Sequence, residues 1–294
     1  MKSGFVTLIG RPNVGKSTLM NRLIGQKIAI TSHKAQTTRS QIQTVYTDER
    51  GQIVFLDTPG IHRARTRLGD YMVEEARSTL KEVDLILWLV EPEDGIEEKE
   101  EQILSYLEGI QRPVILVVNK ADTVKEAALS ACRSRFEGRF GFAAACSISA
   151  LTGEGTEALQ QMIFDSLPEG PLYYDEETLT DQSLRALAGE LIREKALRHL
   201  SREVPHGIAV EIESFKEEPG RPVMIEAALI CERESHKGIV IGKGGSMLKT
   251  IGSEARRDIE ELMESAVNLK LFVKVRKDWR NDKNQLSSLG YRRK

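Results

Sequence analysis

A glycine-rich segment near the N-terminus has the residue types and spacing that bind phosphate. Gly10–Ser17 reads Gly-Arg-Pro-Asn-Val-Gly-Lys-Ser and fits the pattern G-x-x-x-x-G-K-[ST]. It follows the apolar run Phe5–Ile9 and opens a helical pattern, so backbone N–H groups and a helix N-terminus would surround phosphate oxygens. Lys16 would reach the β- and γ-phosphates, and Ser17 would ligate Mg²⁺. The residues predicted here to contact a nucleotide are Gly10, Asn13, Val14, Gly15, Lys16, Ser17 and Thr18.

A second candidate, Asp57-Thr-Pro-Gly60, directly follows the apolar run Ile53–Leu56. A carboxylate at the carboxyl end of a parallel strand faces the ligand crevice. Asp57 would therefore be a second Mg²⁺ holder, and the N–H of Gly60 would contact the γ-phosphate. By itself the tetrapeptide is an ordinary turn, but behind a phosphate loop it is a strong signal.

The segment Asn119-Lys120-Ala121-Asp122 follows the apolar run Val114–Val118 and indicates a guanine site. The Asp122 carboxylate would accept hydrogen bonds from N1–H and the exocyclic amine of guanine, a donor pair that adenine lacks. Asn119 would hold the base edge and the turn, while the stem of Lys120 would pack on the ring.

A weaker signal, Ser149-Ala150-Leu151, follows the last apolar run, Ala144–Ile148. There the Ala150 N–H would meet the guanine carbonyl. As a set, the four motifs resemble the P-loop GTPase family, in its translation-factor-related class, over roughly residues 3–170. The resemblance implies an α/β domain with a mostly parallel sheet, and GTP hydrolysis.

The two nucleotide-dependent switches are expected around the second motif. Ala35–Arg39 is the candidate for switch I, and Ile61–Leu68 is the candidate for switch II. The hydroxyl of Thr38, preferred over that of Thr37, would complete the Mg²⁺ shell. The predicted metal ligands are Ser17, Thr38 and Asp57, and the predicted catalytic group is Asn13, Lys16, Thr38 and Gly60.

The sequence departs from many GTPases at Ile61, where they carry a glutamine that orients the attacking water. An apolar side chain there implies slow intrinsic hydrolysis or a different device. In related GTPases, asparagine at the position of Asn13 is associated with a potassium ion near the phosphates. The alternative, that Asn13 only shapes the loop, has equal weight, and His62 is expected to be incidental.

Charge is distributed unevenly along the 294 residues. The whole chain has a formal net charge of −2, but residues 1–179 carry about −6 and residues 180–294 about +4. Three scattered cysteines, no signal pattern and no apolar run of membrane-spanning length favour a protein of the reducing cytosol. The expected organisation is a GTPase domain over 1–170, a linker over 171–182, an α+β domain over 183–277 and a basic tail over 278–294.

The second half has the order α-β-β-α-α-β, with Gly242-Lys-Gly-Gly245 between two helical segments. This G-x-x-G loop resembles that of a bacterial-type (type II) KH domain, which clamps single-stranded RNA. Alone, such a loop is usually a turn. The predicted RNA contacts are Ile239, Ile241, Gly242, Lys243, Gly244, Gly245, Lys270, Lys274, Arg276 and Trp279.

A GTPase domain joined to one KH domain resembles the Era family of bacterial ribosome-assembly GTPases, and Gln36-Thr-Thr-Arg39 and Asp57-Thr-Pro-Gly-Ile-His62 support the match. The resemblance implies binding of 16S rRNA near its 3′ end, action in 30S subunit maturation, a monomer, and peripheral membrane association in some members. The rival interpretations are a tRNA-modifying or other housekeeping GTPase that does not act on rRNA, and a binding module with a degenerate GTPase site.

Overall fold

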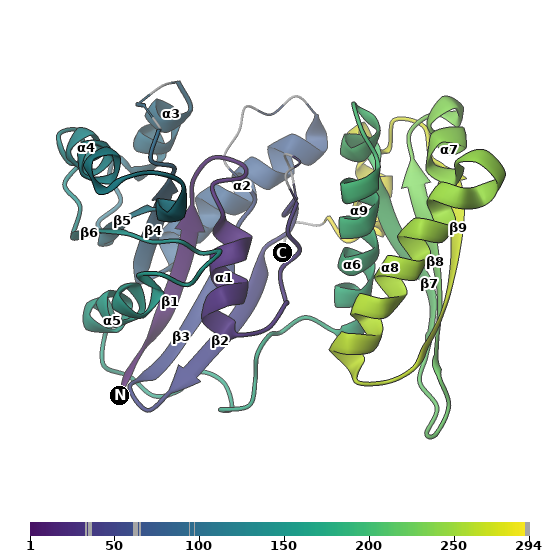
Figure 1. Cartoon of the computed structure of the whole chain (residues 1–294), viewed down its shortest axis with the longest axis horizontal. Helices are drawn as coiled ribbons and strands as arrows, with labels where there is room; N and C mark the ends of the chain where they lie inside the picture. Colours follow the sequence, from purple (N-terminus) through teal and green to yellow (C-terminus); the bar gives the residue numbers. More distant parts are fainter. Residues whose placement is uncertain are drawn as a thin grey trace. The chain divides into compact units, whose positions relative to one another are not determined.

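The computed structural model describes residues 1–32, 34, 37–60, 64, 66–93, 95–96 and 98–291. The expectations for Ala35, Gln36, Ile61 and His62 lie outside these residues. The chain divides into two compact units (Figure 1). The first consists of Met1–Ala29, Thr38–Ala64 and Met72–Asp181. The second consists of Ile30–Thr37, Arg65–Tyr71 and Gln182–Lys294.

The first unit is built on a six-stranded sheet in the order β2-β3-β1-β4-β5-β6. All neighbouring strands pair in parallel except β2, which is antiparallel to β3. The strands are β1 (Lys2–Ile9), β2 (Ile42–Asp48), β3 (Gly51–Asp57), β4 (Leu85–Val90), β5 (Val114–Val118) and β6 (Ala144–Ser147). The predicted α/β fold with a mostly parallel sheet is confirmed.

Helices cover both faces of this sheet. One core cluster contains apolar residues of α1 and α5, and the other contains those of α2, α3 and α4. The inner strands are therefore buried on both faces, which is why they read as continuous apolar runs. The helices are α1 (Lys16–Ile24), α2 (Arg67–Glu82), α3 (Glu98–Leu107), α4 (Glu126–Glu137) and α5 (Thr156–Ser166).

The segment expected to be a linker is hydrogen-bonded to the first unit for most of its length. Gln52 accepts from the backbone N–H groups of Tyr173 and Tyr174 and donates to the Tyr174 carbonyl. Further along, the N–H of Val45 in β2 donates to the carbonyl of Leu179 at 2.8 Å. Residues up to Asp181 therefore belong to the first unit.

The second unit has a three-stranded sheet, β7-β8-β9, with α6, α7 and α8 contributing to one core. β7 and β8 are antiparallel, whereas β8 and β9 are parallel. Ser183 caps α6 by accepting a hydrogen bond from the Ala186 N–H at 3.2 Å. The elements are α6 (Leu184–His199), β7 (Ala209–Lys216), β8 (Val223–Cys231), α7 (Glu234–Ile241), α8 (Ser246–Met263) and β9 (Val267–Val275).

The residues expected to form a basic tail fold in part, and they correct one prediction. A 3₁₀ turn (Trp279–Asn281) and α9 (Lys283–Ser288) follow β9. Trp279 is 0% exposed, donates its indole N–H to the Gly207 carbonyl at 2.9 Å, and stacks on Tyr291. The predicted RNA contact of Trp279 is wrong, because the ring is buried inside the unit and its indole N–H is bonded there.

We expect Trp279→Ala to destabilise the second unit by about 3–5 kcal/mol, the usual cost of emptying a buried aromatic site. Urea unfolding followed by circular dichroism measures the change, and Trp279→Phe, which keeps most of the ring, is the control. Loss of RNA affinity with unchanged stability would restore a base-stacking role for Trp279.

Candidate functional site

The phosphate loop runs from the end of β1 into α1 and is held by residues far along the chain. Gly15 has φ +101°, and a Cβ there would lie 2.1 Å from the Asn119 side-chain nitrogen. Only glycine permits this approach. Asn119 donates to the Val14 carbonyl at 2.7 Å, so the guanine motif supports the phosphate loop directly.

Lys16 is buried at the base of the loop. Its Nζ donates to the carbonyls of Gly10 and Arg11 at 3.1 and 3.0 Å. Burial lowers the pKa of Lys16 to about 8, against the opposing effect of the Asp57 charge. The ammonium group therefore sits beside the loop, where phosphate would supply the missing negative charge.

Three oxygens meet beside Lys16. The hydroxyls of Ser17 and Thr38 each donate to Asp57 Oδ2 at 3.1 Å, and the two hydroxyl oxygens lie 3.2 Å apart. Burial raises the pKa of Asp57, with Lys16 and the two hydroxyls acting in the opposite direction. The structure thus brings together the three predicted metal ligands, which come from α1, from residue 38 and from the end of β3.

The donor set fits Mg²⁺. Octahedral Mg²⁺ binds oxygen at about 2.1 Å, which puts adjacent ligand oxygens about 3 Å apart. The buried Oδ1 of Asp57 has no hydrogen-bond donor among the described residues. Within the part of the chain that the structure describes, no group of three or more His, Cys, Asp or Glu side chains could hold a metal ion. Phosphate oxygens would complete the Mg²⁺ shell at this site.

Gly60 brings the second motif back to the phosphate loop. A Cβ on Gly60 would lie 3.3 Å from the Pro12 nitrogen and 3.4 Å from Lys16 Nζ. The backbone of Gly60 is therefore next to the place where a γ-phosphate would lie, in agreement with its predicted contact. The side chain of Asn13, at φ +72° in the same loop, is exposed.

The guanine motifs lie at the carboxyl ends of the neighbouring strands β5 and β6. Asp122 presents an exposed carboxylate from a 3₁₀ turn, Ala121–Thr123. Lys120 takes the left-handed conformation at φ +65° and pairs with Glu91 at 2.6 Å. The Asp122 carboxylate is thus accessible to the edge of a base, while the Lys120 ammonium is paired with Glu91.

The last motif differs from expectation in one contact. The Ala150 N–H donates to Asn119 Oδ1 at 2.9 Å, so it is already used and does not point to a guanine carbonyl. Ser149 is buried and accepts from the Thr152 N–H, which shapes the turn, whereas Leu151 is exposed. The amide nitrogen and the amide oxygen of Asn119 therefore bond to the phosphate loop and to the Ala150 turn, respectively. Asp122 is then the side chain that stays available for recognition of the base.

Sequence reasoning missed several residues that support this site. Asn21 on α1 donates to the Ala29 carbonyl and accepts from the N–H groups of Ile28 and Ala29, which fixes the chain entering switch I. Arg11 of the phosphate loop pairs with Glu100 of α3 at 2.8 Å. No local motif marks either interaction, because each depends on residues brought together by the fold.

The Gly242–Gly245 loop connects α7 to α8. Gly242, Gly244 and Gly245 all have positive φ, and a Cβ on Gly242 would lie 2.7 Å from Met247 Cβ. Lys243 is exposed on this loop, and Ile239 before it is 49% exposed, while Val240 is fully buried in the core. The predicted RNA contacts Lys243 and Ile239 are thus accessible.

The predicted basic strand is charge-compensated. Lys270 pairs with Glu226 at 3.3 Å, Lys274 with Glu213 at 2.5 Å, and Arg276 with Glu211. The lysines alternate along β9 with Leu269, Leu271 and Val273, which pack on the core under the helices. Because Val240 of α7 belongs to that same core, the glycine loop and the strand lysines lie on opposite faces of the sheet.

Known families match both units. A model described as 50S ribosome-binding GTPase matches residues 5–120, and a KH domain model matches residues 203–280. The chain is 52% identical to GTPase Era of Alkaliphilus oremlandii and 50% identical to that of Geobacter metallireducens. Each alignment covers 99% of this chain and 98–99% of the relative. The chain belongs to the GTPase Era family.

Solved structures of the Era family agree with the fold. One crystal structure of Era, in complex with MgGDPNP and nucleotides 1506–1542 of 16S ribosomal RNA, has a TM-score of 0.95 and 38% identity. A single-residue variant of Aquifex aeolicus Era, bound to GDP and AlF4⁻, gives the same values. Both matches cover 99% of each chain, so the chain is a GTPase with an Era-type domain pair.

Among the described residues, no helix combines the length and the apolar character needed to cross a bilayer.

The low pKa of Lys16 makes GDP binding by this Era-family chain pH-dependent. Bound phosphate stabilises the ammonium form, so nucleotide binding requires proton uptake above the pKa of about 8 in the free protein. We expect the GDP affinity to fall as pH rises above 8, approaching about tenfold per pH unit. Titration from pH 7 to 9.5 at fixed ionic strength measures this.

The matched control is Lys16→Arg, because a guanidinium stays protonated over this range. Its affinity is expected to be lower but far less dependent on pH. A wild-type affinity that is constant over the range, or an equal slope in both proteins, would contradict the role given to the Lys16 proton.

Proposed function

We propose that this protein is a GTP-controlled switch that binds 16S rRNA near its 3′ end and assists maturation of the 30S subunit. The observation that carries the proposal is the relative crystallised with a GTP analogue and that rRNA segment, which matches 99% of this chain. The complete set of Lys16, Ser17, Asp57 and Asn119 around the phosphate loop supports the nucleotide half of the proposal.

Ser17, Thr38 and Asp57 would hold Mg²⁺ together with the phosphates. The ion would supply Lewis-acid stabilisation of charge on the transferring phosphoryl group. Thr38 can complete this arrangement only when the chain around residue 38 is close to α1, as it is here at 3.2 Å from Ser17. Its hydroxyl therefore makes the position of switch I depend on the triphosphate.

The RNA half of the proposal depends on the loop Gly242–Gly245. Three glycines among its four positions, and the exposed charge of Lys243, suit close approach to a nucleic-acid backbone. Ile239 adds exposed apolar surface before the loop. Lys270, Lys274 and Arg276 are proposed only as secondary contacts, because RNA would have to compete with their carboxylate partners. A monomeric state and peripheral membrane association stay predictions from the family resemblance, and a cytoplasmic location stays a prediction from the sequence pattern.

Nucleotide and RNA binding should be thermodynamically linked. We expect the affinity for an oligonucleotide of the 16S rRNA 3′ end to be about 5-fold to 150-fold higher with a GTP analogue than with GDP. Fluorescence anisotropy with GTP analogue, GDP and no nucleotide measures it. Equal RNA affinities in all three nucleotide states would contradict the proposal that the nucleotide controls RNA binding.

Two charge reversals locate the RNA contact in the same experiment. Lys243→Glu is expected to weaken RNA binding. It should also lower the number of counterions released on binding, measured from the salt dependence of the affinity, by about one. Lys216→Glu makes the same change at an exposed end of β7 in the same unit and should have a smaller effect. Equal effects would argue against the loop as the site and favour a GTPase that acts on another substrate.

We further propose that Asn13 binds K⁺ beside the phosphates, since residue 61 is isoleucine and supplies no water-orienting amide. GTP hydrolysis should then be at least about tenfold faster in KCl than in NaCl of equal ionic strength. The comparison protein is Asn13→Gly, because glycine accepts the loop conformation at φ +72°. Equal rates in both salts would leave Asn13 with a loop-shaping role alone.

A further inference from the structure

Arg22 lies in the last turn of α1, the helix that follows the phosphate loop. The connection between β6 and α5 reaches this helix (Figure 1), and Arg22 Nε donates to the Ala150 carbonyl there at 3.3 Å. Arg22 Nη2 donates to the next carbonyl, that of Leu151. The stem of Arg22 runs past Gly153, where a Cβ would lie 3.8 Å from Arg22 Cδ. One side chain of α1 therefore holds two successive carbonyls of the Ala150 turn.

The Ala150 turn is in turn bonded to the segment that presents Asp122. The Ala150 N–H donates to Asn119 Oδ1, and the Ala121 N–H donates to the Ile148 carbonyl, both at 2.9 Å. Asp122 follows Ala121 directly, inside the 3₁₀ turn. The position of the Asp122 carboxylate therefore depends on the position of the Ala150 turn.

These contacts form a closed ring with α1. Asn119 also donates to the Val14 carbonyl at 2.7 Å, immediately before Gly15, the residue that caps the N-terminus of α1. The N-terminal end of the helix is thus bonded to the guanine motifs through Val14, and its last turn is bonded to them through Arg22. The second of these connections is made by a side chain, so a substitution can remove it without changing the phosphate loop.

We propose that Arg22 is a positioning residue for guanine recognition. By holding the Ala150 turn against α1, it fixes the distance between Asp122 and the phosphate loop, which the base and the phosphates of one nucleotide must both fit. This inference rests on the role given to Asp122, because Arg22 acts through the turn and does not touch the nucleotide. Arg22 is exposed, so water competes for its hydrogen bonds and the effect on affinity is moderate.

The test compares GDP with inosine diphosphate, which lacks only the exocyclic amine that Asp122 would accept. Arg22→Met removes the donors and keeps an unbranched stem. We expect it to weaken binding of GDP by about tenfold and of inosine diphosphate by about threefold, because only GDP loses the aligned contact between its amine and Asp122. Competition against a fluorescent GDP derivative measures both affinities.

Two variants are the controls for this experiment. Arg22→Lys keeps the charge and a donor, so it should restore part of the preference for GDP. Arg135→Met makes the same change at an exposed position in the last turn of α4, in the same unit, and should leave the ratio of the two affinities unchanged. If Arg22→Met weakens both nucleotides by the same factor, Arg22 only stabilises the fold and the proposal is overturned.

Asp122→Asn separates this inference from the assignment of the guanine site. Xanthine has a carbonyl in place of the exocyclic amine, so an asparagine amide should move the preference from GDP toward xanthosine diphosphate. If it does so and Arg22→Met leaves the ratio of GDP to inosine diphosphate affinity unchanged, positioning by Arg22 is refuted and the role of Asp122 stands. If Asp122→Asn leaves the preference for GDP unchanged, both are overturned.

Discussion

The buried carboxylate of Asp57 is the interaction on which the nucleotide site depends. It lies between the Lys16 ammonium and two hydroxyl donors, and only one of its oxygens is satisfied by described residues. A buried carboxylate is costly unless charge and hydrogen bonds compensate it. Its neighbours come from α1 and from residue 38, so its buried charge is compensated only where α1, β3 and residue 38 are together.

The sheet order explains why those stretches meet. β1 and β3 are neighbours, so the phosphate loop and Asp57 leave the same edge of the sheet, and β5 and β6 bring the guanine motifs to that edge in the same way. Asn119 then bonds to both Val14 and Ala150, which connects the two halves of the site. The nucleotide site is in this sense one hydrogen-bonded assembly of loops on a rigid sheet.

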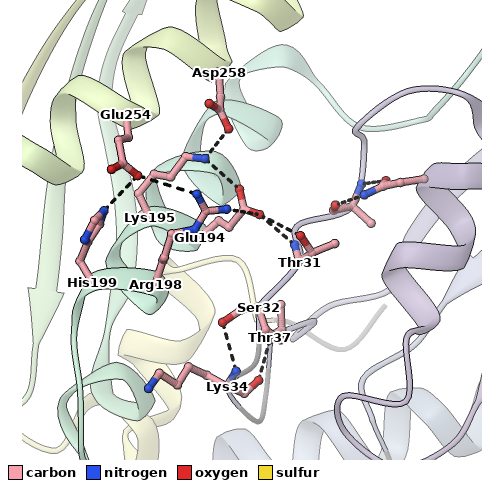
Figure 2. Close-up of polar contacts among 12 residues, drawn as sticks. Thr31, Ser32, Lys34, Thr37, Glu194, Lys195, Arg198, His199, Glu254 and Asp258 are labelled. Carbon is pink, nitrogen blue, oxygen red and sulfur yellow. Dashed lines mark hydrogen bonds and ion pairs between the residues drawn. The ribbon is translucent and has the colours of Figure 1, made fainter. Parts of the chain in front are cut away.

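In the second unit, charged side chains on α6 and β9 are compensated by nearby carboxylates. In α6, Arg193 and Lys195 are buried and pair with carboxylates of the same unit, Glu190 and Asp258. The buried Glu194 lies 3.4 Å from the Lys195 ammonium and accepts hydrogen bonds from Thr31 (Figure 2). In β9 the lysines are exposed and paired with carboxylates, so their contribution to RNA affinity is reduced by the partners they would have to give up. In the loop Gly242–Gly245, the exposed Lys243 has no carboxylate partner among the described contacts, so RNA would not have to displace one.

The sequence by itself determined the strands β1, β4 and β5, the phosphate and guanine motifs, and the KH-type loop. These features are local: apolar runs mark strands buried on both faces, and fixed spacings mark loops whose backbone must approach a ligand. The sequence could not determine that Trp279 is buried or that Glu211 and Glu213 pair with Arg276 and Lys274. Nor could it determine that Glu194 accepts hydrogen bonds from Thr31. Only the tertiary structure decided these, because each pairs residues far apart in the chain, and a charged or aromatic side chain reads the same in sequence whether its partner is water, RNA or another part of the protein.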